Sequence, residues 1–90
     1  MNELHAIVHG RVQLVMFRDF TQRKARKLGI KGFVRNLPDG TVEVVGQGEK
    51  EALQKLLERL HHGSLLSRVD AVESAWRVPD RSFTSFDIVY

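Results

Sequence analysis

The first part of the chain holds a short apolar run followed by a longer amphipathic stretch. Leu4 to Val8 is the apolar run, and it stops at His9-Gly10, which predicts a buried strand followed by a loop. From Phe17 onward, apolar side chains recur at helical spacing with basic side chains between them. The basic residues gather toward the last turns and Gly29 follows, so we expect the helix to end there.

The following positions predict a pair of strands and a second helix. Ile30 to Leu37 and Thr41 to Gln47 are the expected strands, joined by the turn sequence Pro38-Asp39-Gly40. Leucines at i, i+3, i+4 and i+7 predict a helix from about Glu49 to His62, and Gly63 is placed to stop it. Two further extended segments are expected at 69–78 and 83–90, and imperfect alternation suggests a bulge at 73–75.

This order of elements predicts an α+β fold. It reads β-α-β-β-α-β with an additional C-terminal strand, which is the ferredoxin-like sandwich of two helices packed on one face of a mostly antiparallel sheet. The 90 residues contain no internal repeat and no linker. We therefore expect a single domain over residues 1–90.

Composition removes several classes of function. The chain has no cysteine, which excludes a disulfide framework, a thiol nucleophile and zinc sites built on thiolates. The N-terminus lacks the pattern of a signal peptide, and no apolar stretch approaches the roughly 20 residues that span a bilayer. We expect a cytoplasmic monomer without membrane contact. The formal charge of +3 fits a phosphate-bearing metabolite as well as a nucleic acid, so charge alone does not choose between them.

The junction between the first strand and the first helix is the first candidate site. It runs from Gly10 to Arg18, and such junctions collect free backbone N–H groups beside the positive end of the helix dipole. The guanidinium of Arg18 can pair with two phosphate oxygens at once. The simpler interpretation, which a junction of this kind favours when taken alone, is a connecting loop with Arg18 in solvent.

Asn36 is the second candidate. In a β-α-β unit the second strand runs in the same sense as the first, so it ends beside the loop that followed the first strand. Asn36 lies near that end, and its amide could hold a water against a phosphorus atom. The residues alone favour a plainer role, in which Asn36 starts the turn that follows it.

Two motifs at these places resemble the acylphosphatase family. Residues 10–18, Gly-Arg-Val-Gln-Leu-Val-Met-Phe-Arg, are similar to the family signature G-x-V-Q-G-V-x-F-R. Residues 32–42 are similar to its second motif, G-x-V-R-N-x-x-D-G-x-V, and the likeness continues into the C-terminal strand. The resemblance implies a ferredoxin-like fold and an acylphosphatase that hydrolyses acyl phosphates to a carboxylate and inorganic phosphate, with no metal and no organic cofactor.

The resemblance also implies roles for individual residues. Arg18 would bind the phosphate and Asn36 would orient the attacking water. An oxygen of the substrate's own phosphate would accept the proton of the water, since no general base lies beside Asn36 in the sequence. The loop would add main-chain donors to the phosphate, and its residues are Arg11, Val12, Gln13, Leu14, Val15, Met16 and Phe17.

Leu14 departs from the family pattern, which usually has glycine there. Glycine permits positive φ and close approach of an anion, whereas a leucine held at positive φ costs about 1–2 kcal/mol. The alternative function is therefore a weak or silent acylphosphatase-like module that binds phosphate or nucleic acid. Nucleic acid is not expected, because RNA readers of this fold stack bases on aromatic residues of central strands, and 4–8 and 41–47 contain none. The adjacent His61 and His62 do not make a metal pattern.

Overall fold

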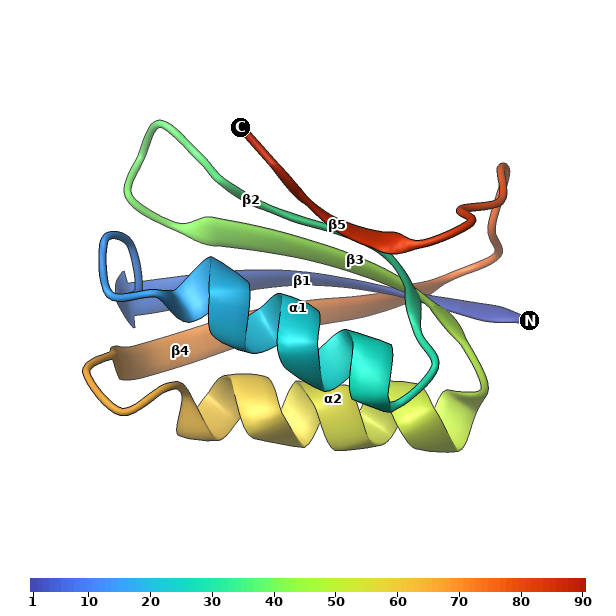
Figure 1. Ribbon diagram of the computed structural model, residues 1–90, viewed down its shortest axis with the longest axis horizontal. Coiled ribbons are helices and arrows are strands. Elements are labelled where there is room, and N and C mark those ends of the chain that lie inside the picture. Colours follow the sequence, from blue (N-terminus) through green and yellow to red (C-terminus); the bar gives the residue numbers. More distant parts are fainter.

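The computed structural model describes residues 1–90 and contains five strands and two helices in the expected order (Figure 1). The elements are β1 (Asn2–Arg11), α1 (Phe17–Lys27), β2 (Lys31–Asn36), β3 (Val42–Gly48), α2 (Lys50–His62), β4 (Arg68–Arg77) and β5 (Phe86–Val89). Neither helix is long and apolar enough to cross a membrane.

The strands form one sheet in the order β4-β1-β3-β2-β5. The pairs among β4, β1, β3 and β2 are antiparallel, and β5 joins the edge parallel to β2. Both helices lie side by side on one face of the sheet (Figure 1). This arrangement confirms the expected ferredoxin-like α+β fold with an added C-terminal strand.

The core lies between the sheet and the helices. Successive strand residues point to opposite faces, so alternate positions of β1 (Leu4, Ala6, Val8) face the helices and are fully buried. The predicted leucine stripe of α2 supplies the opposing surface, with Leu53 and Leu56 fully buried. Each such side chain contributes about 1.5–3 kcal/mol when fully buried, so the patterns read from the sequence account for the packing of the layers.

The expected bulge at 73–75 is wrong. Pairing between β1 and β4 is regular there, and the register shifts between His9 and Gly10, which leaves Asp70 as the extra residue of β4. The cause is the close approach of backbone at Gly10, which has φ of 129° and lies where a Cβ atom would meet Arg68 O at 2.1 Å. Only glycine fits that crossing.

The last strand is shorter than expected, because residues 83–84 do not pair in the sheet and Ser85 contributes only its carbonyl, which accepts from Gly32 N at 2.9 Å. Phe83 packs against Phe33, with ring centroids 5.8 Å apart, and its N–H donates to Gln47 Oε1 at 3.2 Å. Only Phe86–Val89 pairs with β2. The pairing of Arg35 with Val89 brings the end of β5 to the end of β2.

Candidate functional site

The connection between β1 and α1 is anchored at both ends and projects in the middle. Val12 and Phe17 are each 1% exposed, whereas Leu14 is 96% exposed and Met16 is 73% exposed. Both exposed residues have left-handed backbone angles, with φ of 61° at Leu14 and 59° at Met16. Leu14 therefore adopts a backbone conformation that glycine takes freely, and its side chain points into solvent.

The backbone N–H groups of this connection lack partners. No amide from residue 13 to residue 19 donates to a backbone carbonyl, and the first such bond at the start of α1 runs from Phe20 N to Met16 O at 3.0 Å. Met16, which precedes the helix, provides no side-chain cap. Free amides at the positive end of a helix dipole are suited to an anion.

Arg18 lies in the first turn of α1 and has no carboxylate within ion-pairing distance. The neighbouring carboxylate, Asp19, accepts a hydrogen bond from Arg23 Nε at 3.0 Å instead. The guanidinium carbon of Arg18 lies 4.8 Å from the centroid of the Tyr90 ring. Such stacking contributes about 0.5–1 kcal/mol at an exposed site and leaves the N–H groups of the fork open to an anion.

Asn36 ends β2, where it pairs with Val42 of β3. It follows Val34 by two residues and so lies on the face that carries the helices. Its side-chain carbonyl oxygen is buried and has no hydrogen-bond partner. An unsatisfied buried polar atom costs about 1–3 kcal/mol, so this oxygen is suited to a donor that the chain does not itself provide.

The turn after β2 does not use the Asn36 side chain. Its backbone bonds run from Leu37 N to Thr41 O at 2.9 Å and from Gly40 N to Leu37 O at 3.1 Å. The carboxylate of Asp39 accepts hydrogen bonds from the N–H and the hydroxyl of Thr41, and these bonds lower the pKa of Asp39. Asp39, rather than Asn36, is the side chain that stabilises this turn.

Gln13 joins the loop to that turn, which the sequence analysis did not foresee. Its Nε2 donates to Leu37 O at 2.9 Å and to Thr41 O at 2.8 Å. These two bonds hold the loop before α1 against the β2–β3 connection. The free amides, Arg18 and Asn36 therefore lie at the same end of the sheet, although Gln13 was expected to contribute only its main chain.

A cleft of about 280 Å³ opens beside Arg18. Six of its eight lining residues are apolar, and the full lining consists of Val12, Leu14, Met16, Phe17, Arg18, Asp19, Ile88 and Tyr90. Asn36 is not among them. However, Arg35 of β2 pairs with Val89 of β5, and Asn36 and Tyr90 are the next residues of the two chain segments, so Asn36 lies next to Tyr90. Alternation along β5 was the sequence signal that could have assigned Tyr90 to this site.

Two of the expected loop residues take other positions. Arg11 is the last residue of β1, where it pairs with Arg68 and is exposed. Val15 is partly buried against the core, and its carbonyl is 3.5 Å from the Ser64 hydroxyl. The cleft contains neither of them.

None of the four histidines lines this cleft, and three of them each pair with a single acceptor. His5 Nε2 is 2.8 Å from a carboxylate oxygen of Glu43, and His9 pairs with Glu73. His62 is bonded to the carbonyl of Glu58 near the end of α2, at 2.9 Å. No three potential metal ligands of the His, Cys, Asp and Glu types lie together.

The chain matches a family model described as Acylphosphatase over residues 4–88. It is similar to a protein named acylphosphatase from Thermus thermophilus, with 54% identity over 76 residues that cover 84% of this chain and 86% of that one. A protein of the same name from Mycolicibacterium smegmatis is 49% identical over 83 residues, which cover 92% of this chain and 85% of the other.

Solved structures show the same likeness. The crystal structure of acylphosphatase from Bacillus subtilis superimposes with a TM-score of 0.97 and 38% identity, and the match covers both chains completely. An acylphosphatase from Coxiella burnetii gives a TM-score of 0.93 and 33% identity, over 98% of this chain and 92% of the other.

Proposed function

Because the chain belongs to the acylphosphatase family and is an acylphosphatase, we propose that the hydrolysis takes place where the loop before α1 meets the end of β2. The substrate is an acyl phosphate, and the products are a carboxylate and inorganic phosphate. The observation that carries this placement is the unpaired Arg18 guanidinium beside a run of amides without acceptors.

The loop and Arg18 bind the phosphoryl group in this proposal. The amides from Val12 to Phe17 donate to its oxygens, and the two-pronged guanidinium of Arg18 takes two oxygens at once. Stacking on Tyr90, at 4.8 Å, restricts the guanidinium before substrate arrives. Donors fixed in this way stabilise the charge of the transferring phosphoryl group more than mobile ones, because they need no reorganisation during the reaction.

Asn36 orients the water in this proposal. Its buried carbonyl oxygen has no partner in the chain, so a water hydrogen can satisfy it. The oxygen of that water attacks phosphorus, the bond between phosphorus and the acyl oxygen breaks, and the carboxylate leaves with the electron pair. A phosphoryl oxygen takes the proton of the water. The cleft needs no general base, because the carboxylate is a good leaving group and positioning supplies most of the rate.

The lining of the cleft sets the acyl groups that we expect. Leu14, Met16 and Tyr90 present apolar surface beside Arg18, so aromatic and aliphatic acyl groups fit better than charged ones.

We further propose that the protein acts as a cytoplasmic monomer and needs neither a metal nor an organic cofactor.

The test is release of phosphate from benzoyl phosphate by single variants. Arg18→Ala is expected to lower kcat/KM at least about a hundredfold, as loss of a transition-state donor does. Arg18→Lys keeps the charge without the fork and is expected to recover only part of that loss. Asn36→Ala is expected to lower kcat by about a hundredfold with little change in KM, because it acts on water rather than on substrate.

Arg23→Ala is the matched control, since Arg23 lies on the same helix and pairs only with the exposed Asp19. It is expected to change kcat/KM less than about twofold, as exposed ion pairs contribute little. Equal activities of the Arg18→Ala and Arg23→Ala variants, with both folded by circular dichroism, would refute this site.

A further inference from the structure

The largest hollow on the molecule lies away from the catalytic cleft, between the two helices. It has a volume of about 620 Å³, which is the size of a small-molecule site. Its lining residues are Lys24, Lys27, Leu28, Lys55, Glu58, Arg59 and His62. None of them lines the cleft beside Arg18. We call this hollow the interhelical groove.

The interhelical groove concentrates the positive charge of the protein. Its lining has four residues of the Lys and Arg types and one glutamate, a formal charge of +3. The whole chain has 14 basic and 11 acidic residues and the same net charge of +3. The remaining ten basic and ten acidic residues balance, so the groove accounts for the entire net charge.

The cations of the groove have few partners within the chain. Lys24 is half-buried, and neither it nor Lys27 nor Arg59 forms an ion pair or a side-chain hydrogen bond. Lys55 approaches Glu51 only at 3.8 Å. Two other basic side chains of α1 are matched, Arg23 by Asp19 and Arg26 by Asp87, and Arg18 belongs to the catalytic cleft. Unmatched like charges held close together repel one another, and a bound anion removes that repulsion.

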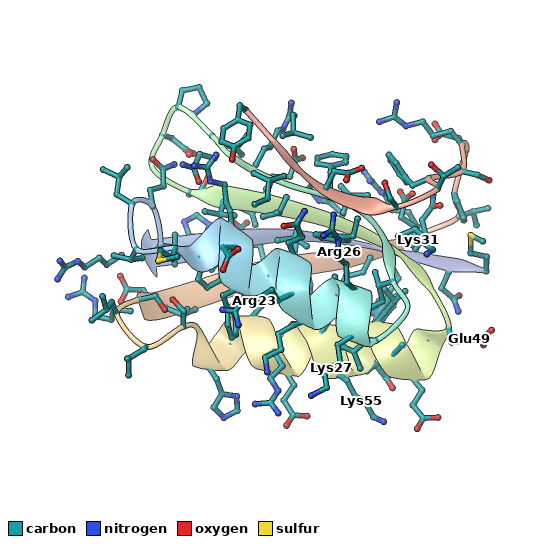
Figure 2. All side chains as sticks on the ribbon, viewed as in Figure 1. Arg23, Arg26, Lys27, Lys31, Glu49 and Lys55 are labelled. Atoms are coloured by element: carbon teal, nitrogen blue, oxygen red, sulfur yellow. The ribbon has the colours of Figure 1, made fainter.

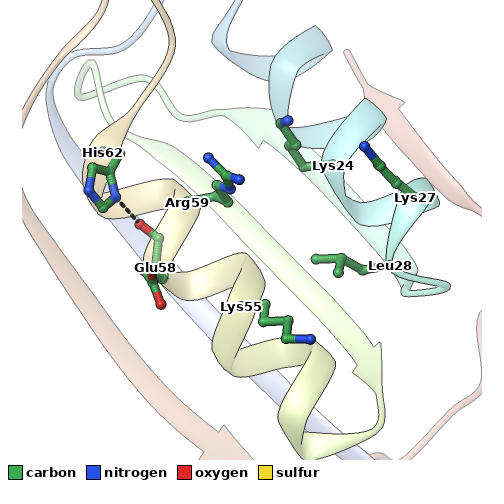
Figure 3. A pocket seen from close by; sticks show the side chains of 7 residues that line it. All are labelled: Lys24, Lys27, Leu28, Lys55, Glu58, Arg59 and His62. Carbon is green, nitrogen blue, oxygen red and sulfur yellow. Dashed lines mark hydrogen bonds between the residues drawn. The ribbon is translucent and has the colours of Figure 1, made fainter.

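The close view shows how the side chains are arranged (Figure 3). Lys24 and Lys27 come from α1, and Arg59 and Lys55 lie on the side of α2 that faces α1. Glu58 is the one acidic residue of the lining, and its side chain lies on the side of α2 away from Lys24 and Lys27, so it offsets only one of the four positive charges. Lys27 of α1 and Lys55 of α2 lie beside each other in Figure 2 and line the same hollow.

Helix dipoles explain only part of this pattern. Basic residues are favoured in the last turn of a helix, and Lys24 and Lys27 of α1 and Arg59 of α2 are in such turns. The dipole does not require them to face one another across a hollow, and Lys55 lies outside the last turn of its helix.

We propose that the interhelical groove is a second anion site, which binds a compact polyphosphate through Lys24, Lys27, Lys55 and Arg59. The four cations match a ligand with several negative charges close together, and the volume admits a molecule rather than a polymer. Leu28 is the only apolar lining residue, so the groove offers no surface for membrane insertion. It contains no Phe, Tyr or Trp on which a nucleic-acid base could stack.

The test measures binding of inorganic tripolyphosphate by titration calorimetry at about 50 mM salt, where charge pairs are weakly screened. All proteins carry Arg18→Ala, so that the proposed catalytic site does not contribute. The groove variant adds Lys24→Gln and Arg59→Gln. The control variant adds Lys31→Gln and Arg81→Gln. Like the groove variant, it loses one lysine and one arginine, but these two residues form no ion pair and lie outside the groove.

The groove variant is expected to bind tripolyphosphate at least about tenfold more weakly, and the control variant to stay within about twofold of the parent. Orthophosphate is expected to bind the parent at least about tenfold more weakly than tripolyphosphate, since it engages fewer cations. Absence of binding at low salt, an equal loss in both double variants, or equal affinity for orthophosphate would each overturn the proposal.

Discussion

Replacement of Leu14 by glycine separates backbone strain from side-chain bulk in the loop before α1. The leucine has φ of 61°, a conformation that costs an L-residue about 1–2 kcal/mol and costs glycine almost nothing. Its side chain is 96% exposed, so removing it loses almost no buried surface. Glycine adds about 0.5–1 kcal/mol of chain entropy to the unfolded state. The net effect on folding is a gain of roughly 0–1.5 kcal/mol.

The consequence for catalysis follows from the same strain. A loop that relaxes away from left-handed angles misaligns its amides when no phosphate is bound, and glycine removes the reason to relax. If about 1 kcal/mol of strain is relieved in the bound state, kcat/KM for benzoyl phosphate rises about fivefold in Leu14→Gly. Steady-state kinetics measure this rise, and urea unfolding measures the change in folding free energy.

Leu14→Ala is the matched control, because it removes the side chain and keeps the cost of positive φ. Because alanine keeps the cost of positive φ and loses the leucine's apolar surface in the cleft, kcat/KM is expected to stay unchanged or to fall. A rise in Leu14→Ala as large as that in Leu14→Gly would refute the reasoning from strain. Unchanged or lower activity in Leu14→Gly, with the fold intact, would show the leucine to be harmless.

Two further predictions concern Gln13 and Glu43. Gln13→Ala removes two hydrogen bonds, and we expect it to lower the free energy of unfolding by about 1–2 kcal/mol and to lower kcat/KM. The control Gln22→Ala removes a bond to Phe86 O and is expected to lower stability alone. Equal effects of the two variants on kcat/KM would contradict this. Burial raises the pKa of Glu43, but hydrogen bonds from His5 and Arg35 outweigh it and lower the pKa below 4.5. The stabilisation is therefore present above pH 4.5 and is lost as pH falls through the folded pKa. Glu43→Gln is expected to lower the unfolding free energy by about 1–2 kcal/mol at pH 7. Urea unfolding at a series of pH values should show the difference in unfolding free energy between the unmodified protein and the variant shrinking in acid. A difference that does not change with pH would argue against the ionised carboxylate.

The periodicity of apolar residues predicted the elements and the fold class, because each helix and strand buries one face. It could not predict the bulge at Asp70, which depends on how closely Gly10 approaches Arg68 across the sheet. Residues 83–85 alternate like a strand, yet Phe83 packs against Phe33, a contact that sequence spacing does not encode.

The places of the candidate residues in the fold were predicted from local sequence. Arg18 lies at the start of α1 and Asn36 at the end of β2, as expected, and their roles remain a prediction from the family resemblance. The contact from Gln13 to residues 37 and 41 is tertiary and carries no local signal. From the sequence, the basic residues of α1 are predicted to form a solvent-exposed face. The sequence does not show that Arg59 faces them from α2, because Arg59 lies more than 30 positions away along the chain.

The two bonds from Gln13 make the hairpin turn and the loop before α1 a single mechanical unit. Adding or deleting a residue between Leu37 and Thr41 would displace the carbonyls to which Gln13 donates, and the loop would have to move with them or detach. The length of that turn is consequently as constrained as the loop itself. Engineering that lengthens surface turns to add an epitope or a linker should spare this hairpin.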